Sequence, residues 1–349
     1  MNKTGIVRDE KFMDHRPGPY HPESHKRLEA LYDMLEENEM SEKFIEIPRT
    51  LAEKNDLELI HSPEYVRLIE DTAGREGTFL DADTSTSSGS YDAACLAAGG
   101  LCKAISMVME GDLDNAFALV RPPGHHAERN RAMGFCLFNN VAIGAGYAKK
   151  KYGVERILIV DWDLHHGNGT QHSFEDDPSV LYFSTHQYPY YPGSGSFGET
   201  GSGNGRGYTL NVPLSTGHGD GEFAALFEQI LVPVAGEYKP ELILVSAGFD
   251  IYQFDPLGGM MVTPDGFAAL TRALMNTAVT CCDGKLVMTL EGGYHIKGLR
   301  DSVRAVLREM LGSTHTDVED MARKADKTKM SYLLSNVEKT HGRTWKSLF

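Results

Sequence analysis

Residues 156–169 read RILIVDWDLHHGNG, an apolar run that ends in a cluster of carboxylates and imidazoles. The run Arg156–Val160 is apolar at every position after the arginine, as expected of a strand covered by helices on both faces of a parallel sheet. In open parallel sheets, ligands bind beyond the carboxyl ends of the strands. The polar residues that follow Val160 are therefore the first candidates for a functional site.

Further apolar runs of the same kind recur along the chain. We predict additional strands at Ala116–Val120, Val180–Phe183, Tyr208–Val212, Glu241–Val245 and Lys285–Leu290. Helical composition between them predicts helices at Ala93–Met109, Asn139–Lys151 and Phe223–Tyr238, with Pro233 kinking or shortening the last. This alternation predicts an α/β fold with a mostly parallel, doubly wound sheet.

Two helix starts and one loop have local signatures. Ser62-Pro63 and Thr263-Pro264 each place an N-cap residue before proline at the first helical position. The glycine-rich stretch 192–207 leads into a strand rather than a helix, so we expect a turn-rich surface loop and not a phosphate-binding loop. We expect one domain over residues 1–349, with a core at about 5–311 and a C-terminal extension at about 313–349 to which no function is assigned.

Composition narrows the function classes. The chain has 349 residues, 41% of them hydrophobic, and a formal net charge of −15, which disfavours nucleic-acid binding and is compatible with a cationic substrate. No run approaches the ~20 apolar residues of a membrane span, and the first residues lack a secretory signal, so we expect a cytoplasmic protein. The five cysteines form no CxxC pair, which indicates neither a disulfide framework nor a thiolate zinc site.

The predicted strand ends carry complementary chemistry. Asp163 and His165 supply a carboxylate and an imidazole within reach of one ion, and Asp250, after the Glu241–Val245 strand, is the natural third ligand. Any one of these residues could instead belong to a capped turn or a satisfied buried pair. The cluster as a whole favours a cation, because adjacent carboxylates beside an apolar strand are costly without one.

Two histidines and a tyrosine follow other predicted strands. His125 and His126 could also be metal ligands, but we interpret them as acid/base groups, with Asp161 and Asn168 each orienting one of them. An asparagine would orient a histidine without raising its pKa as a carboxylate does. Tyr294 follows two glycines and could donate a hydrogen bond to an oxyanion on a substrate carbonyl.

Taken together, the motifs RPPGHHAE, GFCLFNN, DWDLHHGNGTQ, SAGFD, DPLGG and EGGY closely resemble the zinc-dependent histone deacetylase family. This family includes acetylpolyamine amidohydrolases and bacterial deacetylase-like amidohydrolases. The resemblance runs from His21-Pro22-Glu23 to about Leu311. Asn168, where some relatives carry Asp, and the DWD and GFD motifs look like the class II branch.

The resemblance implies an arginase/deacetylase-type fold with a central eight-stranded, mostly parallel sheet. It implies Zn²⁺ on Asp163, His165 and Asp250. It further implies that His126 is the general base, that His125, paired with Asp161, acts mainly through its charge, and that Tyr294 polarises the carbonyl.

The resemblance also implies a K⁺ ion and a substrate tunnel. The K⁺ site maps onto Asp161, Asp163, His165, Ser184 and Thr185. The acyl-lysine tunnel maps onto Gly134, Phe135 and Tyr191, and Arg27 matches an arginine near the acetate exit. Some polyamine-selective relatives carry Glu at the position of Leu257, so Leu257 favours acyl-lysine or broader substrates.

Several alternatives stay open on the sequence. Acetylated lysine in a peptide or protein is the favoured substrate, and an acetylated polyamine is the main alternative with the same mechanism. A binuclear manganese ureohydrolase of arginase type would need more bridging ligands than the sequence offers, and a catalytically silent acyl-lysine reader should have lost ligands or the tyrosine. The sequence does not decide between Zn²⁺ and Fe²⁺, and it is compatible with a homo-oligomer.

Overall fold

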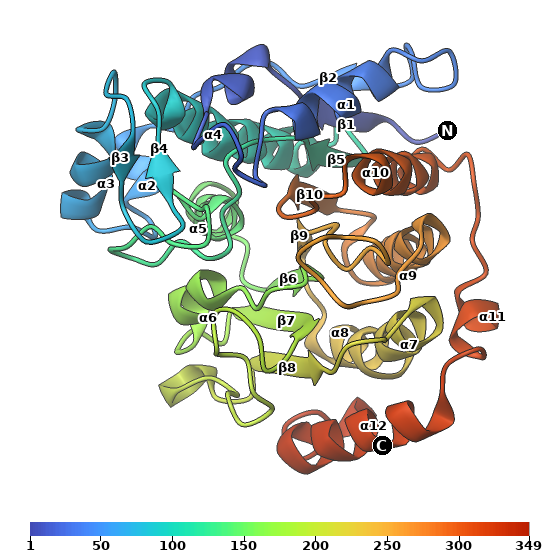
Figure 1. The fold of residues 1–349 in the computed structure, drawn as a ribbon. Coiled ribbons are helices and arrows are strands. Elements are labelled where there is room, and N and C mark those ends of the chain that lie inside the picture. The colour runs from blue at the N-terminus through green and yellow to red at the C-terminus, as the bar shows by residue number, and fades with distance from the viewer. Residues whose placement is uncertain (349) are drawn as a thin grey trace.

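The computed structural model describes residues 1–348 as a parallel sheet between two layers of helices (Figure 1). The eight strands lie in the order β2-β1-β5-β10-β9-β6-β7-β8, and every neighbouring pair is parallel. Their bounds are Thr4–Val7 (β1), Ile45–Glu46 (β2), Asn115–Ala118 (β5), Ile157–Asp161 (β6), Val180–Gln187 (β7), Thr209–Leu214 (β8), Leu242–Ala247 (β9) and Leu286–Leu290 (β10). The predicted fold class is confirmed.

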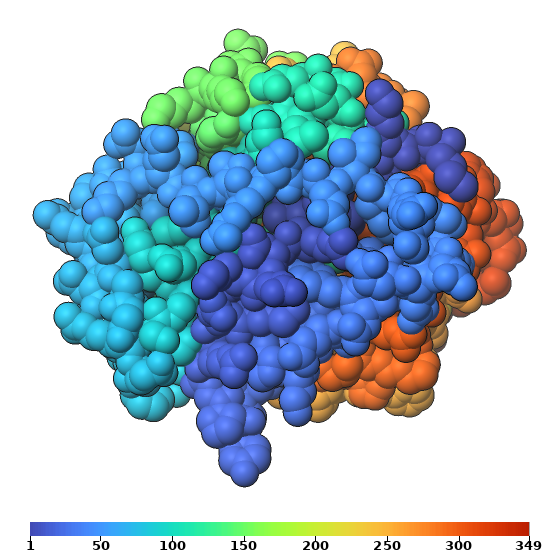
Figure 2. Space-filling view, turned by 90° about the horizontal axis from the view of Figure 1, so that it is seen from above, coloured from blue at the N-terminus to red at the C-terminus, as the bar shows by residue number. Residues whose placement is uncertain are grey.

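All six strands predicted from apolar runs are present, with ends shifted by at most four residues. The sequence patterns missed β1 and β2. β2 has two residues and is too short to show a period, and β1, with the sequence TGIV, has only two consecutive large apolar side chains. Thr78–Phe79 (β3) and Ser85–Thr86 (β4) form a separate antiparallel pair. Figure 2 shows N-terminal residues covering most of the surface at the end of the molecule where β1 and β2 lie.

Helices cover both faces of the sheet. In Figure 1, α4 (Ser90–Met109), α5 (Asn140–Tyr152) and α6 (Asn168–Phe174) lie on one side. On the other side lie α7 (Asp220–Leu226), α8 (Val232–Tyr238), α9 (Pro264–Cys282) and α10 (Ile296–Met310). The remaining helices are α1 (Lys26–Leu35), α2 (Lys54–Leu57), α3 (Pro63–Glu70), α11 (Val318–Ala322) and α12 (Lys327–His341).

Helix α4 is long and apolar enough to cross a membrane by length and composition alone, although the sequence analysis expected no such segment. However, 78% of its apolar stretch is buried inside the protein. Its glycines and alanines allow close packing on neighbouring segments: Gly99 lies against the backbone of residues 50–52, and Gly100 lies against Val7. A buried core helix accounts for its composition.

Two local predictions need correction. The Phe223–Tyr238 segment is helical as predicted, but it starts at Asp220, and a π-helical turn at Phe227–Leu231 separates α7 from α8. Pro233 lacks an N–H, and a π turn is one way to accommodate the lost bond within a helix.

Helix α9 begins at Pro264, but Thr263 does not cap it; its hydroxyl donates to Asp220 Oδ2 at 2.7 Å. Ser62 does cap α3, accepting from the N–H of Tyr65.

The glycine-rich stretch and the C-terminal extension are more closely packed than the sequence indicated. Residues 192–207 connect β7 to β8, and Glu199 within them accepts hydrogen bonds from the N–H groups of Gly195 and Ser196. Helix α11 packs on α7 and α9, and α12 lies beside β8 (Figure 1). Although the extension is polar in composition, its helix α12 has buried apolar residues, namely Met330, Leu333 and Val337.

Candidate active site

The site forms at the carboxyl ends of four consecutive strands, β5, β10, β9 and β6. The segment 121–126 follows β5, and residues 162–168 follow β6. Asp250 follows β9 by three residues, and Glu291–Tyr294 follow β10 directly. Because parallel neighbours end at the same edge of the sheet, residues as far apart in the chain as Gly124 and Glu291, which are 167 positions apart, meet there.

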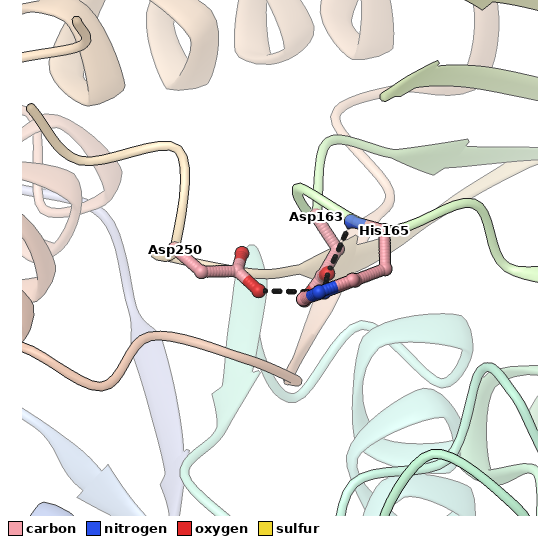
Figure 3. Close-up of side chains that lie close together, drawn as sticks. All are labelled: Asp163, His165 and Asp250. Carbon is pink, nitrogen blue, oxygen red and sulfur yellow. Dashed lines mark hydrogen bonds and ion pairs between the residues drawn. The ribbon is translucent and has the colours of Figure 1, made fainter. Parts of the chain in front are cut away.

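Asp163, His165 and Asp250 form a buried group with the spacing of a metal site (Figure 3). Their ligand atoms all lie within 4.8 Å of one another. His165 Nδ1 lies 3.2 Å from Asp163 Oδ1 and 3.1 Å from Asp250 Oδ2. Backbone N–H groups hold the other carboxylate oxygens, since Gly292 donates to Asp163 Oδ2 and Leu164 donates to Asp250 Oδ1.

The electrostatics of this group favour a positive charge at its centre. Burial and repulsion from Asp163 raise the pKa of Asp250. Burial alone would lower the pKa of His165, but hydrogen bonds to Asp163 and Asp250 raise it to about 9, which places a proton between the two carboxylates. A divalent cation can take the place of that proton, and two carboxylates with one imidazole are suitable zinc ligands. The residues present therefore fit a zinc ion.

His125 and His126 lie beside this group and have different partners. His125 Nδ1 lies 3.0 Å from Asp161 Oδ2, and His126 Nδ1 lies 2.7 Å from Asn168 Oδ1. Both pairings are the ones expected from the sequence. Asp161 Oδ1 also accepts from the N–H of Asp163, so it supports the metal-ligand loop as well as His125.

The two partners shift the histidine pKa values in opposite directions. Burial lowers the pKa of His125, but the carboxylates of Asp161 and Asp163 outweigh it and raise that pKa to about 10. Burial and repulsion from His125 and His165 hold the pKa of His126 well below its usual range. Paired groups with opposite pKa shifts are typical of acid/base sites, and the two partners favour a charged His125 and a neutral His126.

Tyr294 stands at the rim of the same site. Gly293 has φ +115°, a conformation that glycine adopts readily, and it turns the chain after β10. The N–H of Tyr294 donates to Asp255 Oδ2 at 2.7 Å, and its ring lies 6.0 Å from that of Phe135. Burial and the nearby carboxylates of Asp250 and Asp163 raise the pKa of Tyr294 well above its usual value, so the phenol keeps the proton that a donor needs.

Arg27 lies behind this rim and is fully buried. Its guanidinium donates to the backbone oxygens of Gly293 at 2.7 Å and Glu291 at 2.6 Å, and to Glu23 Oε1 at 3.1 Å. It thus holds the segment that carries Tyr294. Glu23 also accepts from the buried guanidinium of Arg121, a pair that motif reading did not assign.

Glu291 is a second site residue to which the sequence reading gave no role. Its side chain is fully buried. It accepts from the N–H groups of Gly124 at 2.6 Å and His125 at 3.2 Å, and from Ser246 Oγ at 3.0 Å. It therefore fixes the segment that presents the two histidines. The available signal was a carboxylate directly after an apolar strand, the same signal that singled out Asp161.

Ser184 and Thr185 lie on β7, the neighbour of β6, and Ser184 is in register with Asp161. Both are buried, and Thr185 Oγ1 has no hydrogen-bond partner in residues 1–348. Ser184 Oγ lies 2.9 Å from His186 Nδ1.

Aromatic rings surround the approach to the metal-binding group. Tyr191 packs edge-on against His126 at 5.1 Å, and Phe135 has φ +68° after Gly134 at φ +56°. A Cβ on Gly134 would overlap the His126 ring, so this position requires glycine. The sequence reading missed Tyr190, which stacks on His165 at 5.7 Å and donates to the backbone oxygen of Leu257 at 2.9 Å.

Comparison with known proteins identifies the family. The histone deacetylase domain family matches residues 21–310. The chain belongs to the histone deacetylase family. It is 39% identical to a probable deacetylase of Archaeoglobus fulgidus over 98% of this chain and 99% of that protein.

A relative of known structure has the same fold. The crystal structure of the HDA15 HD domain superposes with a TM-score of 0.92 at 36% identity, covering 99% of this chain and 96% of that one. The human polyamine deacetylase HDAC10 is 42% identical over 82% of this chain. The chain spans 44% of HDAC10 and 49% of Arabidopsis thaliana histone deacetylase 5, so it corresponds to about half of these longer proteins. Family membership makes the chain a deacetylase, a hydrolase of amide bonds.

Proposed function

We propose that this deacetylase removes acetyl groups from lysine side chains of peptides or proteins, using a zinc ion held by Asp163, His165 and Asp250. One observation carries the proposal: two buried imidazoles, one paired with a carboxylate and the other with an amide, lie beside three converging metal ligands. When bound there, Zn²⁺ lowers the pKa of a water molecule and polarises an acyl carbonyl.

The chain's own residues supply the proton transfers. His126, with Nδ1 directed at Asn168, has Nε2 available to take the proton of the attacking water. The Asp161 carboxylate raises the pKa of His125, which favours the charged imidazole that would stabilise the developing negative charge. Tyr294 donates a hydrogen bond to the carbonyl oxygen as it becomes an oxyanion. A protonated histidine then delivers a proton to the leaving nitrogen, so that amide and water give acetate and free amine.

A chelator experiment tests this proposal. Hydrolysis of a fluorogenic acetyl-lysine peptide should require metal, stop after dialysis against a chelator, and return with one equivalent of Zn²⁺ or Fe²⁺ per chain. Two equivalents of manganese per chain with urea-forming activity would instead support the arginase-type reading. Absence of chelator-sensitive hydrolysis on every acylated amine would support a silent acyl-lysine reader.

The second candidate substrate is an acetylated polyamine. The similarity to human polyamine deacetylase HDAC10 favours it, whereas Leu257, where some polyamine-selective relatives carry Glu, favours acyl-lysine. Both substrates fit the −15 net charge. The deciding measurement is kcat/KM on acetyl-lysine peptides beside acetylated putrescine, cadaverine and spermidine.

The proposal extends to the remaining expected features. Phe135 and Tyr191 would flank the substrate's aliphatic stem above Gly134, and Arg27 would lie near the acetate exit. A K⁺ ion would be held by residues of the β6 and β7 ends, namely Asp161, Asp163, His165, Ser184 and Thr185. The five cysteines are free thiols, which agrees with the cytoplasm as the compartment. The packing of α11 and α12 on the core supports a single domain over residues 1–349.

A further inference from the structure

Glu128 links the active site to the protein surface through Asn168. Its carboxylate Oε1 accepts from Asn168 Nδ2 at 2.6 Å, and both carboxylate oxygens lie within 3.1 Å of His172 Nδ1. The chain of contacts therefore runs from His126 through Asn168 and Glu128 to His172. The Glu128 side chain is 17% exposed and that of His172 is 46% exposed, so this series of contacts ends at the solvent-exposed surface.

The backbone around Glu128 is held firmly. Its N–H donates to the oxygen of Arg131, and its own carbonyl oxygen lies 2.9 Å from His61 Nδ1. Asn168 and His172 lie one turn apart on α6, so both can reach the same carboxylate. Hydrogen bonds from His172 and Asn168 lower the pKa of Glu128 against the effect of burial, which would raise it, so the group is an anion.

A side-chain amide has two orientations, and they have opposite consequences for His126. In the observed one, Asn168 Oδ1 accepts from His126, so the proton is on Nδ1 and the Nε2 lone pair is free. If the amide turned over, its NH₂ group would face Nδ1, and His126 would have to carry its proton on Nε2. A histidine in that tautomer cannot accept a proton at Nε2.

Glu128 selects the productive orientation. The neighbours on the Nδ2 side of Asn168 are all acceptors: Glu128 Oε1, the His126 backbone oxygen at 3.3 Å and Met133 Sδ at 3.4 Å. Turning the amide would place Oδ1 against a carboxylate, with loss of a charge-assisted hydrogen bond. An aspartate at position 168 would not need this control, because both of its oxygens are acceptors.

We propose that Glu128 is a positioning residue that fixes the tautomer of His126 by orienting the Asn168 amide. This inference rests on the proposed role of His126 as the base of the deacetylase. Glu128 reaches His126 through Asn168 and therefore acts by positioning.

The test is a double-mutant cycle between positions 128 and 168. Glu128→Ala should lower kcat by about 10–100-fold, the usual effect of removing a partner one shell away from a reacting group, with KM little changed. Glu128→Gln retains an acceptor oxygen for Asn168 and should recover most of that loss. Asn168→Asp places a second carboxylate oxygen against Glu128, so in that background Glu128→Ala should relieve repulsion and leave kcat unchanged or raised, not lower it. Glu319→Gln, at an exposed carboxylate on α11, is the matched control.

A second readout does not depend on turnover. Long-range ¹H–¹⁵N spectra of the histidine rings, with His126 identified by the signal lost in His126→Gln, should show the proton on Nδ1 in the wild type and a mixture in Glu128→Ala. This result stands even if the enzyme hydrolyses a different amide, so the two proposals fail separately. An equal loss of kcat in both backgrounds, or an unchanged His126 tautomer in Glu128→Ala, would overturn the inference.

Discussion

The imidazole rings of His125 and His126 lie 4.0 Å apart, yet one faces a carboxylate and the other an amide. Two adjacent residues of the same type thereby acquire pKa values shifted in opposite directions. The difference arises in α6 and the end of β6, which supply Asn168 and Asp161, and not in the segment that carries the histidines. The chemistry of the site is therefore decided by what surrounds each ring.

Removal of a metal ligand should abolish both metal binding and turnover. Asp250→Ala leaves one carboxylate and one imidazole, too few ligands for a three-residue zinc site. We expect bound metal to fall well below one equivalent per chain and kcat to fall by more than about 10²-fold. This loss exceeds the usual effect of replacing a residue that contacts a metal ligand but does not bind the metal. Metal analysis of the purified variant checks this. Asp283→Asn, at an exposed carboxylate, serves as control, and full metal occupancy in Asp250→Ala would exclude Asp250 as a ligand.

Tyr294→Phe should separate metal binding from catalysis. The variant keeps the ring and its packing near Phe135 but loses the hydroxyl donor. We expect wild-type metal content, a similar KM and a kcat reduced by about 10²–10³-fold, the usual effect of losing one oxyanion donor. Steady-state kinetics on an acetyl-lysine peptide measure it. Near-wild-type turnover would show that the phenol is not the donor.

Arg121→Met should destabilise the protein strongly. Arg121 and Glu23 are both fully buried, and Arg121 Nη2 donates to Glu23 Oε2 at 2.6 Å. Breaking a buried pair leaves an uncompensated charge and costs about 3–5 kcal/mol, although Arg27 still contacts Glu23. Urea unfolding measures the change. Arg67→Met removes an exposed ion pair with Glu64 and should cost at most about 1 kcal/mol, so equal losses in both variants would contradict this reasoning.

His341→Met should make the protein less sensitive to acid. His341 is fully buried, neither ring nitrogen has a partner within residues 1–348, and burial lowers its pKa to about 4. The unfolded value is about 6.5, so the unfolded chain binds this proton first. Stability is thus fully present above pH 6.5 and is lost as the pH falls toward 4, by about 1.4 kcal/mol per pH unit for this group.

Urea unfolding between pH 8 and pH 4.5 measures that slope. The His341→Met curve should fall less steeply than the wild type below pH 6.5, while the two agree in shape above it. His315→Met, at an exposed histidine, should follow the wild-type curve. Parallel curves for wild type and His341→Met would show that His341 does not carry this pH dependence.

Leu257→Glu should shift selectivity toward polyamines. The backbone oxygen of Leu257 accepts from Tyr190, which itself stacks on His165, so this position is two contacts away from a metal-ligand candidate. A carboxylate there should attract the second ammonium of an acetylated polyamine. We expect its kcat/KM to rise relative to an acetyl-lysine peptide by about 5–30-fold, the factor for 1–2 kcal/mol. Leu257→Gln introduces a side chain of the same shape as glutamate but without its charge. It should leave the ratio of the two kcat/KM values near that of the wild type.

Motif reading recovered much of the candidate site because the active groups follow buried strands directly. An apolar run marks each strand, and a polar residue just beyond the run must lie at the strand end. The sequence alone therefore predicted that Asp163, His165 and Asp250 share one metal site. The short strands β1 and β2 and the π turn before Pro233 carry no comparable pattern. Glu291 and Tyr190 were missed because they contact residues that are far away in the sequence, and the spacing of nearby residues gives no sign of such contacts.

The sequence by itself determined the α/β class, the strand ends that carry chemistry and the candidate metal ligands, since side-chain period and residue type are local properties. Only the tertiary structure decided the order of the strands, which sets β5, β10, β9 and β6 side by side, and the partners that give two adjacent histidines different protonation. Those partners come from chain positions 36 and 42 residues away. Their proximity, and the orientation that Glu128 imposes on Asn168, depend on packing of the whole chain.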